Sequence, residues 1–135
     1  MMRVLMLLMA CACLLLSACK KEPGIGGKSE IRGYVMRQNV SVSGTPIGEP
    51  YAYPEARVYI VYGDHDFYDD DVRAGPDGLF VFSWLREGDY RVYTYGECNV
   101  LLASCPSGQV AVQASAKATG KDDVVNVGTL TALNY

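Results

Sequence analysis

The chain has 135 residues, half of them hydrophobic, and a formal net charge of −3 at pH 7. This length holds one domain and excludes a second one. The acidic balance argues against a nucleic-acid partner, because phosphate backbones attract basic surfaces.

The first segment in chain order is an apolar run at the amino terminus, directly after MMR at residues 1–3. The run covers residues 4–16, thirteen residues without a charge. A membrane-spanning helix needs about 20 apolar residues. The run is therefore too short to span a membrane and is typical of the hydrophobic region of a signal peptide.

Small residues precede a cysteine at the end of this run, in the sequence LSAC at residues 16–19. This sequence resembles the lipobox of bacterial lipoprotein precursors. The resemblance implies that residues 1–18 are removed and that Cys19 carries a diacylglycerol and an acyl chain. Cys11 and Cys13 also follow alanine, but either choice leaves a hydrophobic region of nine residues or fewer. An ordinary secretory signal cleaved nearby is the alternative.

A polar segment rich in glycine and lysine follows, and we expect residues 19–28 to form a flexible tether. Each buried methylene of an acyl chain contributes about 0.8 kcal/mol, so two or three chains hold a protein at a membrane. The residue after Cys19 is Lys20. The resemblance associates aspartate at this position with retention away from the outer membrane, so lysine favours the outer membrane. We expect a lipid-anchored protein of the cell envelope, and the sequence does not indicate which face of the membrane it occupies.

Residues 29–135 contain strand signals at nearly regular intervals and almost no helical periodicity. Turn residues separate the apolar runs, and a long loop is predicted over residues 38–55. The pattern predicts a single all-β domain, a seven-stranded β-sandwich. The predicted strands cover residues 29–37, 56–62, 68–74, 79–84, 89–96, 109–117 and 124–133.

A spaced set of residues within this region resembles carboxypeptidase regulatory-like domains. The set is G-x-V, then A-x-V, then D-G-x-F-x-F-x-x-L-x-x-G-x-Y-x-V. The resemblance implies the prealbumin-like (transthyretin/Ig-like) sandwich that these domains share with collagen-adhesin B-type repeats, and a structural, adhesive or accessory role. The residues that carry it are Gly33, Val35, Ala56, Val58, Asp77, Gly78, Phe80, Phe82, Leu85, Gly88, Tyr90 and Val92. Five of them are predicted to face one interior: Phe80, Phe82, Leu85, Tyr90 and Val92.

Besides Cys19, the mature chain has two cysteines, Cys98 and Cys105. In an oxidising compartment such a pair normally forms a disulfide, which we predict here. Zinc is the alternative, but six residues between two cysteines is not a recognised ligand spacing. The apolar residues 100–102 between them are expected to cap one end of the domain, with a contact to a partner as the alternative.

An acidic segment at residues 63–71 is the candidate for a small-ion site, because calcium binds carboxylate and carbonyl oxygens. Its spacing does not match an EF-hand loop, since Tyr68 and Asp69 stand where a ligand and a glycine are required. The favoured alternative is a charged edge strand that discourages edge-to-edge pairing. The weak calcium candidates are Asp64, Asp66, Asp69, Asp70, Asp71 and Asp77.

Ten tyrosines are many for a chain of this size. Alternation along the predicted strands places Tyr34, Tyr59, Tyr93 and Tyr95 on outward faces, where they could stack on sugar rings or on a peptide. Tyrosines are also ordinary strand formers, which is the alternative interpretation.

An enzymatic role is not expected, because the chain has a single histidine, His65, in a segment dense with carboxylates. We predict no cofactor. The predicted function is that of a non-enzymatic envelope lipoprotein, a membrane-tethered module with a structural or protein-interaction role. The alternative is an accessory module that binds a glycan or calcium.

We expect the mature protein to begin at Cys19 and to carry acyl chains there. Mass spectrometry of the amino-terminal peptide checks this, and Cys19→Ala should leave a precursor that retains residues 1–18. Cys13→Ala is the matched control and should be processed normally. An unmodified mature terminus at another residue would contradict the prediction.

Overall fold

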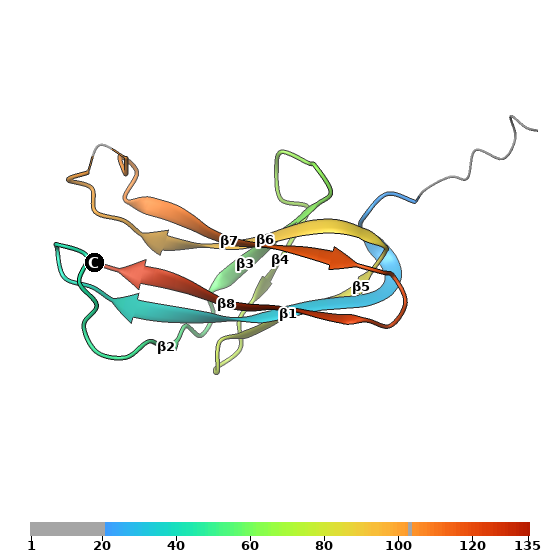
Figure 1. Ribbon diagram of the computed structural model, residues 1–135, viewed down its shortest axis with the longest axis horizontal. Coiled ribbons are helices and arrows are strands. Elements are labelled where there is room, and N and C mark those ends of the chain that lie inside the picture. Colours follow the sequence, from blue (N-terminus) through green and yellow to red (C-terminus); the bar gives the residue numbers. More distant parts are fainter. Residues whose placement is uncertain (1–20, 103) are drawn as a thin grey trace, which may run out of the picture.

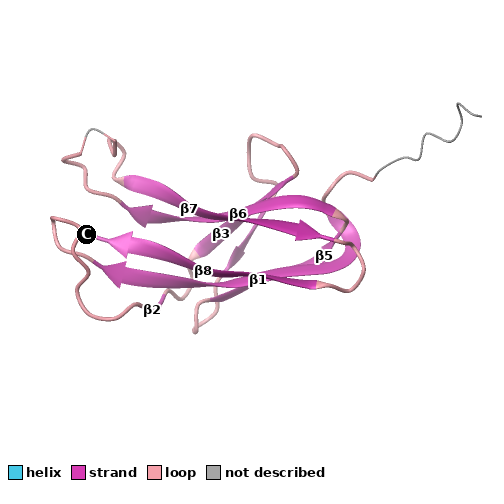
Figure 2. Ribbon diagram, in the orientation of Figure 1, coloured by secondary structure: helices cyan, strands magenta, loops and turns pink. Residues whose placement is uncertain are grey.

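The computed structural model describes residues 21–102 and 104–135 (Figure 1). Within them the chain forms strands and loops, and none of it forms a helix able to cross a membrane (Figure 2). The all-β prediction is confirmed. The strands are β1 (Ile25–Asn39), β2 (Tyr51–Ala52), β3 (Arg57–Tyr62), β4 (Asp70–Arg73), β5 (Leu79–Leu85), β6 (Gly88–Glu97), β7 (Gln109–Ala118) and β8 (Val124–Asn134).

The strands form two sheets that pack face to face as a sandwich (Figure 1). In the first sheet, β1 lies in the centre. β5 and β2 pair antiparallel with β1, one after the other along the same edge, and β8 pairs parallel with its other edge. The second sheet is antiparallel throughout, in the order β4-β3-β6-β7.

The prediction of seven strands is one short, because β2 lies inside the segment predicted as a loop. The pairing of β5 with β1 ends at Tyr34, opposite Leu79. The next residues of β1 would leave backbone groups unpaired, and β2 fills this place through the pair Met36 and Ala52. The seven predicted strands are all present, with β4 shorter than predicted.

The core lies between the sheets and follows from alternation along β5 and β6. The five residues predicted to face the interior are all buried there: Phe80, Phe82, Leu85, Tyr90 and Val92. Trp84 has a φ of 62°, and this left-handed residue breaks the alternation so that Leu85 still points inward. Ile31 of β1, the neighbour of β5, and Val58 of β3, the neighbour of β6, supply another part of the core.

The Asp77-Gly78 pair forms the turn before β5. Gly78 has a φ of +85°, and a Cβ at this position would collide with the carbonyl oxygen of Val35. Asp77 Oδ1 accepts a hydrogen bond from Leu79 N at 3.1 Å, and Gly78 O accepts one from Val35 N at 2.8 Å. The turn therefore fixes β5 against β1.

The chain joins the domain at a fixed point, because Tyr90 holds the residues that precede β1. The Tyr90 hydroxyl accepts a hydrogen bond from Gly24 N at 2.9 Å and donates one to Arg86 O at 2.9 Å. Arg86 N donates to Gly24 O at 2.8 Å. Burial raises the pKa of Tyr90, so the hydroxyl stays protonated and able to donate.

A hydrogen-bond network ties the turn between β7 and β8 to β1. Ser29 is fully buried, and its Oγ donates to Asp123 Oδ1 and accepts from Gly120 N. Asp123 Oδ2 also accepts from Thr119 N at 3.0 Å. The hydrogen bond from Ser29 is the largest of the causes that lower the pKa of Asp123 to about 2.

The lowered pKa predicts how stability depends on pH. The ionised Asp123 contributes stability that is present above pH 4 and is lost as the pH falls through about 2. We expect Asp123→Asn to lower the free energy of unfolding at pH 7 by about 1–2 kcal/mol. The gap from the wild type should close between pH 4 and pH 2, as measured by urea unfolding followed by circular dichroism.

The matched control for this prediction is Asp122→Asn. The Asp122 carboxylate is exposed and makes only a long ion pair with Lys28, at 3.9 Å. Its loss should leave the pH profile of stability unchanged. A wild-type to Asp123→Asn gap that is the same at pH 2 and pH 7 would contradict the role of Asp123.

Candidate functional site

The end of the sandwich opposite the amino-terminal segment is built from three pieces of chain (Figure 1). We call it the distal end and define it as residues 38–48, 98–109 and 133–135. These pieces contain no Asp, Glu, Lys, Arg or His side chain. Arg37 and Glu97 lie beside it and neutralise each other, with Arg37 Nη2 3.3 Å from Glu97 Oε1. The side chains of the distal end thus carry no charge.

A disulfide closes the loop that projects from this end, and the predicted pairing of Cys98 with Cys105 is confirmed. Their Cα atoms lie 6.0 Å apart. Cys98 N donates to Gly108 O at 3.0 Å, and Cys105 N donates to Leu102 O at 2.9 Å. With both sulfurs in the disulfide, neither cysteine is a thiolate that could hold zinc.

Asn99 links this loop to the neighbouring turn. Its Nδ2 donates to Val42 O at 2.8 Å, and its Oδ1 accepts from Leu101 N at 2.9 Å. Leu102 N donates to Asn99 O at 3.0 Å. The loop is therefore fixed by hydrogen bonds at its start as well as by the disulfide.

The apolar residues of the loop do not cap the domain, so that expectation is wrong. Val100, Leu101 and Leu102 are 64%, 79% and 54% exposed. Cys105 is the loop residue that is buried. The hydrogen bonds around Asn99 turn the backbone so that the three aliphatic side chains point away from the core. An exposed aliphatic group on a braced loop is typical of an interaction surface.

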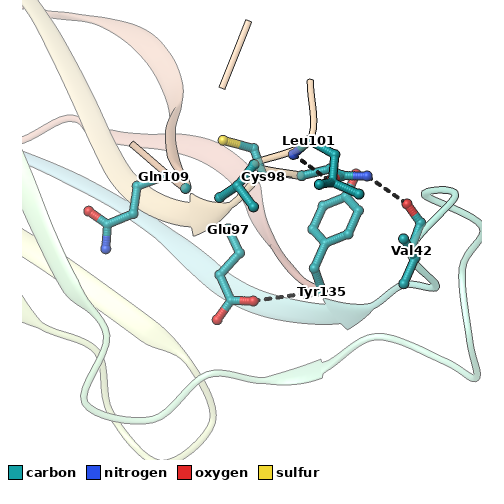
Figure 3. A pocket seen from close by; sticks show the side chains of 9 residues that line it. Val42, Glu97, Cys98, Leu101, Gln109 and Tyr135 are labelled. Carbon is teal, nitrogen blue, oxygen red and sulfur yellow. Dashed lines mark hydrogen bonds between the residues drawn. The ribbon is translucent and has the colours of Figure 1, made fainter. Parts of the chain in front are cut away.

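A pocket of about 630 Å³ lies between this loop, the 40–47 turn and the end of β8. Its lining residues are Val42, Glu97, Cys98, Asn99, Val100, Leu101, Gly108, Gln109 and Tyr135. Figure 3 shows Val42, Leu101 and Tyr135 turned toward this space. The Glu97 carboxylate already has a hydrogen-bond partner within the protein, since its Oε2 accepts from Tyr135 N at 2.9 Å. The lining offers no nucleophile with an adjacent base, and it suits an uncharged, largely apolar group.

The second candidate surface is a tyrosine cluster on the outer face of the second sheet. It consists of Tyr59, Tyr68, Tyr93 and Tyr95. Tyr59 and Tyr93 are opposite each other on β3 and β6, and their rings stack with centroids 5.0 Å apart. The Tyr68 ring lies 4.8 Å from that of Tyr59, and the Tyr95 ring 5.6 Å from that of Tyr93.

The structure brings together three of the four tyrosines singled out in the sequence. Tyr34 lies on β1, in the other sheet, so it is separated from the cluster by the core. Tyr68 was missed, because the sequence analysis placed it at the start of a predicted strand, 68–74, whereas it lies in the loop before β4. Burial is the main cause of the raised pKa of Tyr93, with contributions from Tyr95 and Tyr59. The Tyr93 hydroxyl therefore stays protonated at neutral pH.

The acidic residues do not converge on one point. Among the residues that the structure describes, no three His, Cys, Asp or Glu side chains form a group that could hold a metal ion. Asp71 pairs with Arg57 at 3.1 Å, and Asp77 bonds its own turn. The remaining calcium candidates, Asp64, Asp66, Asp69 and Asp70, lie in or just after the exposed loop before β4. β4 is a charged edge strand of the second sheet, the arrangement that the alternative interpretation predicts.

His65 also has a local role in this loop. Its Nδ1 lies 2.7 Å from Asp69 Oδ1, and this hydrogen bond raises the pKa of the imidazole. Asp69 Oδ2 accepts from Tyr62 N at 2.7 Å, and Arg91 Nη2 donates to His65 O at 2.7 Å. These contacts hold the loop against the end of β3.

Comparison with solved structures gives a likeness of fold. No protein-family model matches the chain, and no curated protein matches its sequence. A crystal structure from Pseudomonas aeruginosa, described as that of "a putative carbohydrate binding protein", is similar with a TM-score of 0.47 and 13% sequence identity. The similarity covers 82% of this chain and 91% of that one. It is too low to bear on function.

Proposed function

We propose that this protein is a non-enzymatic, lipid-anchored module of the cell envelope that binds a protein partner through its distal end. The observation that carries the proposal is the exposure of Val100, Leu101 and Leu102 on a loop braced by a disulfide. Holding aliphatic side chains in water costs free energy, about 25 cal/mol per Å² of apolar surface left uncovered. A partner that covers them recovers this free energy.

The chain geometry supports an orientation with the distal end away from the membrane. The proposed anchor, Cys19, precedes the fixed point at Gly24 by five residues. Five extended residues span at most about 17 Å. The domain would therefore stay close to the membrane surface at one end and present the disulfide loop at the other.

The chemistry of the distal end favours a protein over a second lipid surface. Peripheral membrane binding relies on Lys and Arg near anionic headgroups, and the distal end has neither. The core of a protein interface is depleted of charged residues, and it is often organised around an apolar anchor seated in a pocket. The neutral pocket beside Leu101 has these properties.

A photocrosslinking amino acid at position 101 should give one discrete adduct in cells, because Leu101 is the most exposed of the three aliphatic side chains. The same group at Val124, which is 54% exposed but outside the distal end, is the matched control and should not give that adduct. Leu102→Ser should weaken the adduct from position 101 while changing the free energy of unfolding by less than about 0.5 kcal/mol. Identical adducts from both positions, or none, would contradict the proposal.

The tyrosine cluster supports a second candidate function, the binding of a neutral glycan. Aromatic rings on an exposed sheet face can pack against the apolar face of a sugar. Gln113 lies opposite Tyr93 on β7 and adds an amide for hydrogen bonding. Arg57 and Asp71, which lie beside the cluster, pair with each other, and this favours an uncharged ligand.

If this second function holds, Tyr95→Ser and Tyr93→Ser should lose binding on a glycan array. Tyr34→Ser is the matched control, since Tyr34 is 40% exposed and Tyr95 is 45% exposed, on opposite outer faces. It should bind like the wild type. Equal glycan capture by all the variants would remove the tyrosine cluster as the site.

A further inference from the structure

Apart from the two-residue β2, the two sheets of the sandwich have four edge strands, and three of these carry features that discourage pairing with another strand. β4 carries Asp70, Asp71 and Arg73. β5 is broken near its end by the left-handed Trp84. β8 is interrupted where its register with β1 shifts, beside Gly128 with a φ of +79°. Charges and bulges of this kind are the usual protection of sheet edges.

β7 is the fourth edge strand and lacks such protection. Its ten residues pair with β6 without a register shift, from Gln109 opposite Glu97 to Ala118 opposite Gly88. It contains no proline and one charge, Lys117, which lies opposite Asp89. The other edge of β7 pairs with no strand of the described chain. That edge therefore presents a regular row of backbone N–H and C=O groups.

Beside this edge the core is incompletely covered, at a place we call the open flank. It consists of Val110, Val112 and Ala114 of β7 and of Val125 and Val127 of β8. The two strands lie side by side although they belong to different sheets (Figure 1). Val112, Ala114, Val125 and Val127 pack against the core but are only partly buried, and Val110 is 45% exposed. No strand of the described chain covers this side of the sandwich.

We propose that the edge of β7 binds an extended segment of another polypeptide, which adds to the second sheet as a fifth strand. Side chains alternate across a strand, so every second residue of the segment lies over the open flank and the others face solvent. The segment that fits has apolar residues at alternate positions and no charge among them, because the flank is apolar and holds no ionisable group. This site is distinct from the distal end.

A second copy of this chain fits the flank less well than a foreign segment does. Pairing of β7 with its own copy would bring only valine and alanine methyl groups to the flank, since the inward residues of β7 beyond Val112 are alanines. Antiparallel pairing would also reverse the long axis of one copy, so that the two amino-terminal segments would point in opposite directions. A segment with larger alternating side chains covers Val125 and Val127 better.

The test uses the purified full chain and a fluorescent ten-residue peptide with blocked ends, in which valine alternates with serine or threonine. We expect saturable binding by fluorescence anisotropy and slower amide hydrogen exchange along β7. The same peptide with N-methyl groups on its backbone should bind at least tenfold more weakly, because it cannot donate to the edge. No saturable binding, or equal binding of the methylated peptide, would overturn the proposal.

Two matched variants locate the site. Val112→Lys places a charge on the flank and should weaken peptide binding at least tenfold. Val72→Lys changes a similarly half-buried valine on β4, the opposite edge of the same sheet, and should leave binding within twofold of wild type. Equal losses in both variants would overturn the assignment to β7. The chain could also dimerise without any peptide. If Val112→Lys abolished such a dimer, a second copy of the chain, and not a foreign segment, would be the partner of β7.

Discussion

Backbone hydrogen bonds along both edges of β1 hold the first sheet together. β5 and β2 share one edge, and β8 occupies the other, so these strands have no pairing except through β1. The same strand supplies Ile31 and Val35 to the core and Ser29 to the turn between β7 and β8. A break in β1 would therefore separate elements at both ends of the chain, while the second sheet has no comparable central dependence.

Most of the fold could be predicted from the alternation of apolar and polar residues, because a strand buried on one face places every second side chain in the core. Phe80 and Phe82 show this alternation, and Asp77 with Gly78 indicates the turn that precedes their strand. β2 has two residues, too few for any period, and its position depends on where β5 stops pairing. Such a strand follows from tertiary structure and could not be predicted from sequence.

Less of the candidate surfaces could be predicted, because alternation gives the direction of a side chain and not the sheet to which its strand belongs. Alternation shows that Tyr34 and Tyr59 point outward, but it does not show which sheet each belongs to, and the two lie on opposite faces of the sandwich. The cysteine pairing followed from compartment chemistry. The exposure of Leu101 depends on hydrogen bonds made by Asn99 with its own loop and with Val42, which no local pattern reveals.

The parallel pairing of β1 with β8 joins the first and last strands of the described chain. A contact between such distant segments closes a loop of nearly the whole domain, and topologies of high contact order fold slowly. The first sheet cannot be completed until residues 124–134 are available. A nascent chain that lacks these residues would thus leave one edge of β1 unpaired.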